Sequence, residues 1–182
     1  MMSGDDSARQ NKGKNMRISL STSLLMSLAM SSALAVAAPD QVVQRNDVSL
    51  ALANDLLDAA LAACHADGRT GVAAIVDRGG NLVALQRDDN VGPHNTLAAQ
   101  RKAYTALSTK TPTRLLAELA RSTPDAENLN TLDELLLLGG GVPLVFEGQV
   151  IGAIGVAGAG GAAFDEGCAL VAINKILPAV KN

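Results

Sequence analysis

Three acidic side chains occupy loop positions at which a carboxylate could take part in catalysis. Asp77 precedes the glycine pair of a tight turn, and Asp88 and Asp89 follow the apolar run after that turn. A carboxylate on such a loop can act as a general acid or base toward a small-molecule substrate. Acidic residues also occur beside hairpins for solubility alone, so these three do not by themselves define an active site.

Other kinds of catalytic chemistry find little support in the residue types. The chain has two histidines, His65 and His94, which leaves little room for a metal cluster built on several imidazoles. It has no G-x-S-x-G motif, and no serine is obviously paired with a histidine. These residues favour a binding protein over an enzyme.

A glycine-rich segment at 158–163 matches the G-x-G-x-x-A pattern of a dinucleotide-binding loop. That fold needs a further parallel strand with an acidic residue roughly twenty residues later. The residues from there to Asn182 show no such strand, so we expect the match to be incidental.

The first 37 residues predict a secretory leader. From Met16, an alternative start, a basic Arg17 is followed by an apolar run at 20–36 and then by Ala35-Val36-Ala37. This is the charged region, short apolar region and cleavage pattern of a signal peptide, with cleavage expected after Ala37. A membrane anchor is the alternative. We expect residues 38–182 to form a single domain, periplasmic or secreted, with no membrane span.

Charge and composition limit the partners. The formal net charge is −3, and the chain has one tyrosine, two phenylalanines and no tryptophan. An acidic chain without aromatic stacking platforms argues against a nucleic-acid partner.

In an exported protein, Cys64 and Cys168 form either one disulfide or two separately buried thiols, and the sequence leaves both possibilities open.

The elements that position these residues follow from local signals. Asp47 or Ser49 can cap a helix that runs to about Asp67. The segments GVAAIVD and NLVALQR, at 71–77 and 81–87, flank a glycine turn and predict a hairpin. A helix is expected over 95–108. A further helix is expected with Thr111 as its N-cap and Pro112 at its first position.

The segment from 135 to 164 has one charge, Glu147, and nine glycines. The pattern disfavours a membrane span, because Glu147-Gly148-Gln149 interrupts the apolar run. The same interruption predicts a turn between strands at 142–146 and 150–156. A last helix is expected from near Asp165 to Pro178. The fold class is therefore α/β (α+β), with an antiparallel sheet built from two hairpins and helices on both faces.

Three segments resemble the GlcG/HbpS family of haem-binding proteins, which is related to the C-terminal domain of PduO-type proteins. They are AAIVDRGGNLVALQRDD, PHNTLAAQRKAYTALSTKTPT and LGGGVPLVFEGQVIGAIGVAGA, and the resemblance covers residues 47–180. It implies a profilin-like three-layer α/β/α domain with four to five strands, non-covalent haem and homo-oligomers. In exported members it also implies haem sensing, with a membrane-sensor partner, or scavenging.

Given this resemblance, His94 is the first choice for the iron ligand and Tyr104 the second, because imidazole and phenolate both hold haem iron. Arg101 and Lys102 are expected to face the propionates. The resemblance adds Thr105 and Thr113 as secondary candidates, and His65 is the remaining imidazole. All five methionines lie within the first 30 residues, so methionine ligation is excluded in the mature chain.

Two alternatives to haem remain. The domain could bind another planar or corrinoid-like small molecule, or it could be an oligomeric accessory protein without catalysis. The glycines at 139–141, 152, 155 and 158 fit either view, because they let backbone approach a flat ligand, or let two protomers or a helix and a sheet pack closely. Any redox activity is expected to come from bound haem.

Overall fold

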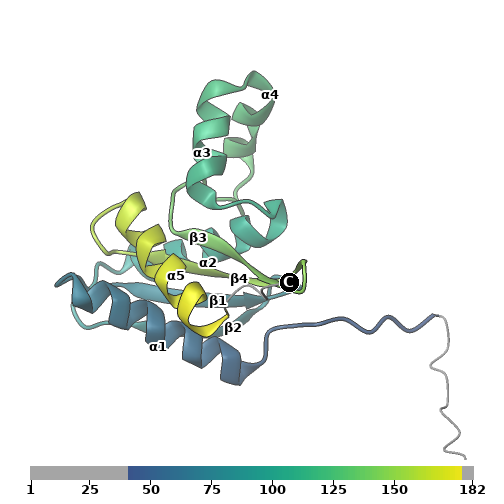
Figure 1. The fold of residues 1–182 in the computed structure, drawn as a ribbon. Coiled ribbons are helices and arrows are strands. Elements are labelled where there is room, and N and C mark those ends of the chain that lie inside the picture. The colour runs from purple at the N-terminus through teal and green to yellow at the C-terminus, as the bar shows by residue number, and fades with distance from the viewer. Residues whose placement is uncertain (1–40, 178–182) are drawn as a thin grey trace, which may run out of the picture. The chain divides into compact units, whose positions relative to one another are not determined.

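The computed structural model describes residues 41–177, and all the helices and strands of this range lie in the unit beginning at Val43. The predicted leader at 1–37 and the predicted helix end at Pro178 lie outside the described residues. The elements shown in Figure 1 are α1 (Leu50–Ala66), β1 (Val72–Asp77), β2 (Leu82–Arg87), α2 (His94–Thr109), α3 (Thr113–Ser122), α4 (Pro124–Glu127), a 3-10 turn η1 (Asn128–Thr131), β3 (Gly141–Phe146), β4 (Gln149–Ala157) and α5 (Ala162–Ile176).

Both predicted hairpins form, and they join edge to edge. The sheet has four strands in the order β2-β1-β4-β3, and every neighbouring pair is antiparallel. The two central strands, β1 and β4, pair from Val72 with Ala157 to Asp77 with Gly152. The predicted α+β class and the sheet built from two hairpins are confirmed.

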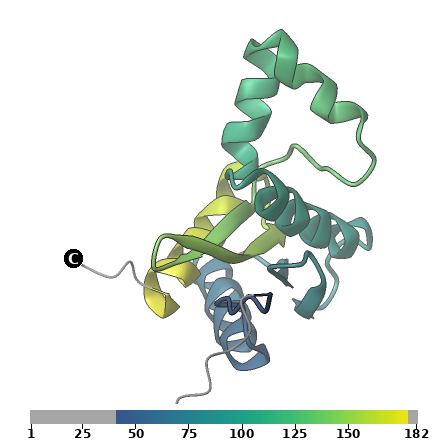
Figure 2. The ribbon, with the colours of Figure 1, turned by 90° about the vertical axis from the view of Figure 1, so that its right-hand side faces the viewer.

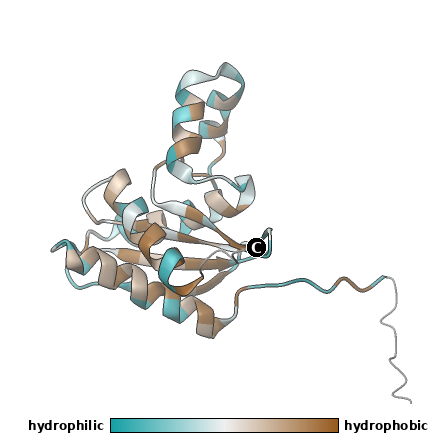
Figure 3. Cartoon of the chain, in the orientation of Figure 1, coloured by the Kyte–Doolittle hydropathy of each residue, from teal (hydrophilic) through white to brown (hydrophobic). Residues whose placement is uncertain are grey.

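Helices cover both faces of the sheet, as Figure 2 shows. On one face, α1 and α5 pack over the larger core, which includes Leu56, Leu57, Ile75 and Ile154. Figure 3 shows apolar and polar positions interspersed along α1 and α5.

The opposite face is covered by α2, which lies unusually close to the strands. Its inner side presents Ala99 and Ala103, both fully buried. A Cβ added at Gly155 of β4 would lie 2.0 Å from the Ala99 carbonyl oxygen, so only glycine permits this approach. This glycine of the central segment therefore serves helix-to-sheet packing, one of the two roles expected for it.

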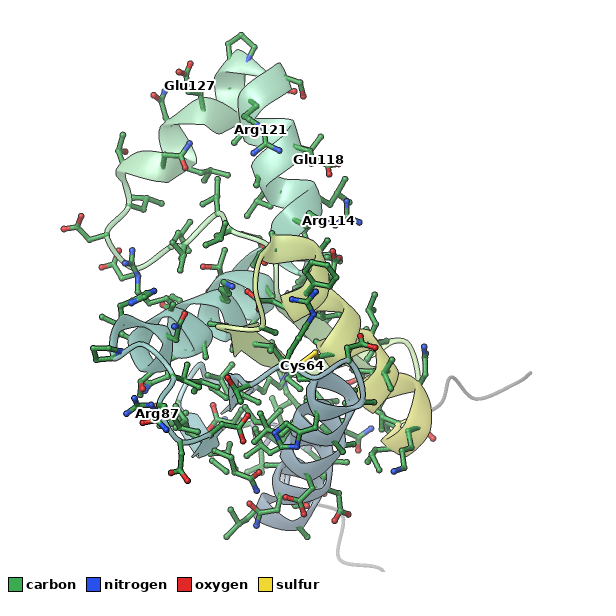
Figure 4. All side chains as sticks on the ribbon, turned by 90° about the vertical axis from the view of Figure 1, so that its left-hand side faces the viewer. Cys64, Arg87, Arg114, Glu118, Arg121 and Glu127 are labelled. Atoms are coloured by element: carbon green, nitrogen blue, oxygen red, sulfur yellow. A yellow bond between two sulfur atoms is a disulfide. The ribbon has the colours of Figure 1, made fainter. Side chains whose placement is uncertain are left out.

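A disulfide joins Cys64 in α1 to Cys168 in α5, and Figure 4 draws it as a yellow bond beside the Cys64 label. The question that the sequence left open is thus settled in favour of a bridge. The bond closes a sequence separation of 104 residues and fastens together the two helices of one layer.

The helix α3 begins one residue later than predicted. Thr111 does not cap it: its hydroxyl donates to the Thr109 carbonyl at 2.9 Å, and Pro112 occupies the N-cap position without a side-chain hydrogen bond. Pro112 is itself in extended backbone, with a ψ of 131°, and its carbonyl accepts the first helical hydrogen bond from the Leu116 N–H at 3.0 Å, so Thr111 lies one residue before the cap position. The predicted Thr111 cap is therefore wrong. The last helix also differs, since α5 begins at Ala162 rather than near Asp165.

Arg114 fastens α3 to the rest of the unit. Its guanidinium donates to Glu166 of α5 and, at 2.9 Å, to Glu118 one turn along, and Figure 4 labels the Arg114–Glu118 pair. Hydrogen bonding to Glu166 and the nearby charges of Glu166 and Glu118 raise the pKa of Arg114.

Among residues 41–177, none of the helices has the length and apolar character needed to cross a bilayer.

Candidate functional site

A groove runs along α2 where the β1–β2 turn packs against it. It consists of two adjoining cavities of about 360 and 300 Å³ that share Gly80 and Tyr104 in their walls. We call it the Tyr104 groove. The larger cavity is otherwise lined by Val76, Leu82, Leu97, Gln100, Arg101 and Glu134. Cavities of this size suit a small organic ligand.

Tyr104 lies between the two cavities and is 37% exposed. The turn reaches it through Gly80, whose φ is +83° and where an added Cβ would lie 2.9 Å from ring carbon Cε2. Only glycine combines this backbone conformation with this closeness. The ring therefore lies in the groove wall.

The turn itself is held by Asp77. Its Oδ1 accepts hydrogen bonds from the backbone N–H groups of Gly79 and Asn81, both at 2.8 Å. Partial burial acts to raise the pKa of Asp77, but the hydrogen bonds from Asn81, Gly79 and Gly80 outweigh it and lower that pKa. Asp77 is thus an ionised structural carboxylate, which does not suit the acid–base role considered from the sequence.

Arg101 forms part of the wall of the larger cavity. Its guanidinium donates to the carbonyl oxygens of Asp133 and, at 2.8 Å, Leu135. Thr105 completes this clamp, because its hydroxyl accepts from the Leu136 N–H at 2.8 Å and donates to the Arg101 carbonyl at 2.7 Å. These bonds hold the segment 132–138 beside α2. Within residues 41–177, the buried Arg101 Nε has no hydrogen-bond partner.

Lys102 and Thr113 lie inside the protein, away from the groove. The Lys102 ammonium is 1% exposed and donates to Asp165 Oδ2 at 2.7 Å and to the Val156 carbonyl at 3.0 Å. Lys102 adjoins Ala103 on the side of α2 that faces the sheet, so the expectation that it faces a propionate does not hold in this geometry. Thr113 accepts from the Gly141 N–H at 2.9 Å and donates to the Leu138 carbonyl at 2.8 Å.

The histidines are placed apart from Tyr104. His65, at the end of α1, meets Asp88 with 2.9 Å between Nε2 and Oδ2, in the layer opposite α2. His94 is the exposed first residue of α2 and does not line either cavity. Of the seven candidate residues, the structure brings Tyr104 and Arg101 together in the groove. No group of three or more His, Cys, Asp or Glu able to hold a metal occurs in the described part of the chain.

The sequence reasoning missed the cations of the smaller cavity. Arg45, Arg78 and Lys110 line it beside Leu107 and Val150. In the sequence Arg78 is recognisable only as a turn residue, and Lys110 lies at the end of α2 with a φ of +54°. The available signal was the position of Arg78 and Lys110, which fall in connections next to elements that carry other groove residues; Arg45, in the segment before α1, carries no such signal.

The fold and the groove define a small α+β binding domain with a ligand groove between a central helix and a hairpin turn. The chain belongs to the GlcG/HbpS family, because the family model described as "Haem degrading protein HbpS-like" matches residues 48–174. This confirms the family inferred from the three sequence segments.

Individual relatives agree. The chain is similar to Protein GlcG of Escherichia coli strain K12, 32% identical over 137 residues, which are 75% of this chain and 84% of that one. It is also similar to a double mutant of HbpS from Streptomyces reticuli, with a TM-score of 0.71, 34% identity, and coverage of 77% and 94%. A PduOC:haem complex matches with a TM-score of 0.65, 27% identity, and coverage of 72% and 96%.

Proposed function

We propose that this protein binds haem non-covalently in the Tyr104 groove and does so outside the cytoplasm, in haem sequestration, sensing or delivery. The observation that carries the proposal is the groove itself, in which apolar side chains flank a single tyrosine. The family and the haem complex of a structural relative support the choice of ligand.

The groove residues fit the requirements of haem. Val76, Leu82 and Leu97 offer an apolar surface for the macrocycle, and the Tyr104 oxygen is a donor suited to ferric iron. The unpaired Arg101 Nε is a further donor at the wall. Haem would supply the redox chemistry of its iron, while the chain's residues bind and orient it. We therefore propose Tyr104, ahead of His94, as the iron ligand.

The proposal is tested by titrating hemin into the mature protein and recording the visible spectrum. Wild type is expected to shift the Soret band. Tyr104→Phe, which keeps the ring and removes the ligating oxygen, is expected to change the spectrum and weaken binding by roughly tenfold, or about 1.4 kcal/mol. His65→Ala is the matched control, because His65 lies in the opposite layer, and it should bind like wild type.

Two outcomes would count against this assignment. The absence of a Soret shift in wild type would overturn haem binding. A spectrum unchanged in Tyr104→Phe but altered in His94→Ala would move the iron ligand to His94.

Export and assembly form the rest of the proposal. The disulfide between Cys64 and Cys168 supports a periplasmic or secreted location, because such bonds persist in oxidising compartments. Leu115 and Leu119 of α3 are 46% and 43% exposed, and we propose that they contact a second copy in a homo-oligomer. Sizing of wild type against Leu115→Gln/Leu119→Gln tests this, with a smaller species expected for the variant.

A further inference from the structure

The two cavities of the Tyr104 groove differ in charge. The smaller one is lined by Arg45, Arg78 and Lys110, and no carboxylate is among its lining residues. The larger one has one acidic and one basic residue in its wall, Glu134 and Arg101. The groove therefore has an excess of positive charge at the smaller cavity and offsetting charges at the larger one.

The three cations of the smaller cavity come from separate segments: the chain before α1, the β1–β2 turn and the C-terminal end of α2. None of them forms an ion pair with an acidic side chain among residues 41–177. Among residues 41–177, the Arg78 guanidinium makes only two hydrogen bonds, both long at 3.4 Å, to the Asn46 carbonyl and to Gln149 Oε1, while the Arg78 backbone N–H donates to Asp47 Oδ1 at 3.0 Å.

Among the Lys and Arg side chains of residues 41–177, only Lys102 and Arg114 form ion pairs, so what sets Arg45, Arg78 and Lys110 apart is that all three line one cavity. Lys102 is paired with Asp165, and Arg114 with Glu118 and Glu166. The unpaired cations meet around the apolar side chains of Leu107 and Val150. A planar ligand with an apolar body and carboxylates on one edge matches this arrangement, since guanidinium groups bind carboxylates through paired hydrogen bonds.

We infer that Arg45, Arg78 and Lys110 form a carboxylate subsite, so that the groove recognises tetrapyrroles by their acidic edge as well as by their metal. The inference rests on the proposed haem function. Glu134 offsets the charge of Arg101 at the opposite end, so the stronger attraction for the acidic edge of the ring lies at the smaller cavity. It follows that a metal-free porphyrin diacid binds the groove and that esterifying its carboxylates weakens binding.

The test uses metal-free mesoporphyrin IX and its dimethyl ester, each followed by porphyrin fluorescence on the mature protein. Wild type is expected to bind the diacid about tenfold more tightly than the ester, in line with two partly exposed charge contacts. In Arg78→Gln/Lys110→Gln this preference should disappear, because the diacid loses affinity and the ester does not. Added salt should weaken diacid binding and leave ester binding unchanged.

A matched control is Arg121→Gln/Lys175→Gln, which removes the same charge from exposed positions on α3 and α5. It should keep the wild-type preference. Unchanged ester binding also shows that the groove variant is folded.

The outcomes separate this inference from the proposed function. If neither hemin nor mesoporphyrin binds wild type, the proposed function fails. If hemin binds but the diacid and the ester bind equally, or if the groove variant loses both ligands to the same extent, haem binding stands and the carboxylate subsite is overturned.

Discussion

At the scale of single residues, Gly80 controls how the hairpin turn meets Tyr104. Two features of Gly80 disfavour any side chain there: its φ is +83°, and an added Cβ would lie 2.9 Å from ring carbon Cε2 of Tyr104. Gly80→Ala is expected to lower the free energy of unfolding by about 1 kcal/mol or more. In a Tyr104→Ala background the cost should be smaller, because the contact is gone and only the backbone strain remains. Urea unfolding of the four proteins measures both, and an equal cost in the two backgrounds would contradict the contact.

The buried pair of Lys102 and Asp165 is a second decisive contact. Lys102→Met leaves the Asp165 carboxylate buried without its cation and is expected to destabilise the fold by about 3–5 kcal/mol. Lys102→Met/Asp165→Asn removes both charges and keeps an oxygen for the Ala159 N–H, so it should lose less than the single variant. Urea unfolding measures the free energy of unfolding of wild type and both variants. A double variant less stable than Lys102→Met would contradict this prediction.

The residue scale is also where sequence reasoning succeeds only in part. Tyr104 and Arg101 line the groove as a ligand site near the central helix requires. The partner of Lys102 lies 63 residues further along the chain. Thr105 accepts from a residue 31 positions away, and the partners of Thr113 lie 25 and 28 positions away. Helix periodicity predicts that α2 forms, but the side that faces the sheet depends on packing between segments far apart in sequence.

At the scale of elements, the β1–β2 turn should make stability depend on pH through Asp77. The pKa of Asp77 is lower in the folded protein than its ordinary value of 3.8. A lowered pKa contributes stability above the unfolded value and loses it as pH falls through the folded one. The stability difference between wild type and Asp77→Asn should therefore shrink below about pH 4. Thermal unfolding from pH 6 to pH 3 measures this, and a constant difference would contradict it.

Local signals predicted most elements, because caps and turns depend on neighbouring residues. Ser49 caps α1 by accepting from the Leu52 N–H at 3.2 Å, and both glycine turns join paired strands. The starts of α3 and α5 were exceptions. At α3 the cap position fell to Pro112 rather than Thr111, because Pro112 is in extended backbone and its carbonyl accepts the first helical hydrogen bond.

At the scale of the whole domain, the layers follow from the two hairpins, but the disulfide does not. Whether Cys64 and Cys168 meet depends on how α1 and α5 share one face of the sheet, which no local pattern contains. Once formed, the bridge restricts the unfolded chain across 104 residues. Cys64→Ala/Cys168→Ala is expected to lower the free energy of unfolding by about 2–4 kcal/mol.

The same bridge makes the stability of the domain depend on the redox state of its compartment. Adding a strong reductant should bring wild type to the stability of Cys64→Ala/Cys168→Ala and leave that variant unchanged, because the bond is the only difference that the reductant acts on. Urea unfolding with and without reductant measures this, and alkylation of the unfolded protein counts its free thiols. Equal stability of wild type with and without reductant, despite two alkylated thiols, would show that the bridge does not stabilise the fold, and the support that it lends to an oxidising location would be lost.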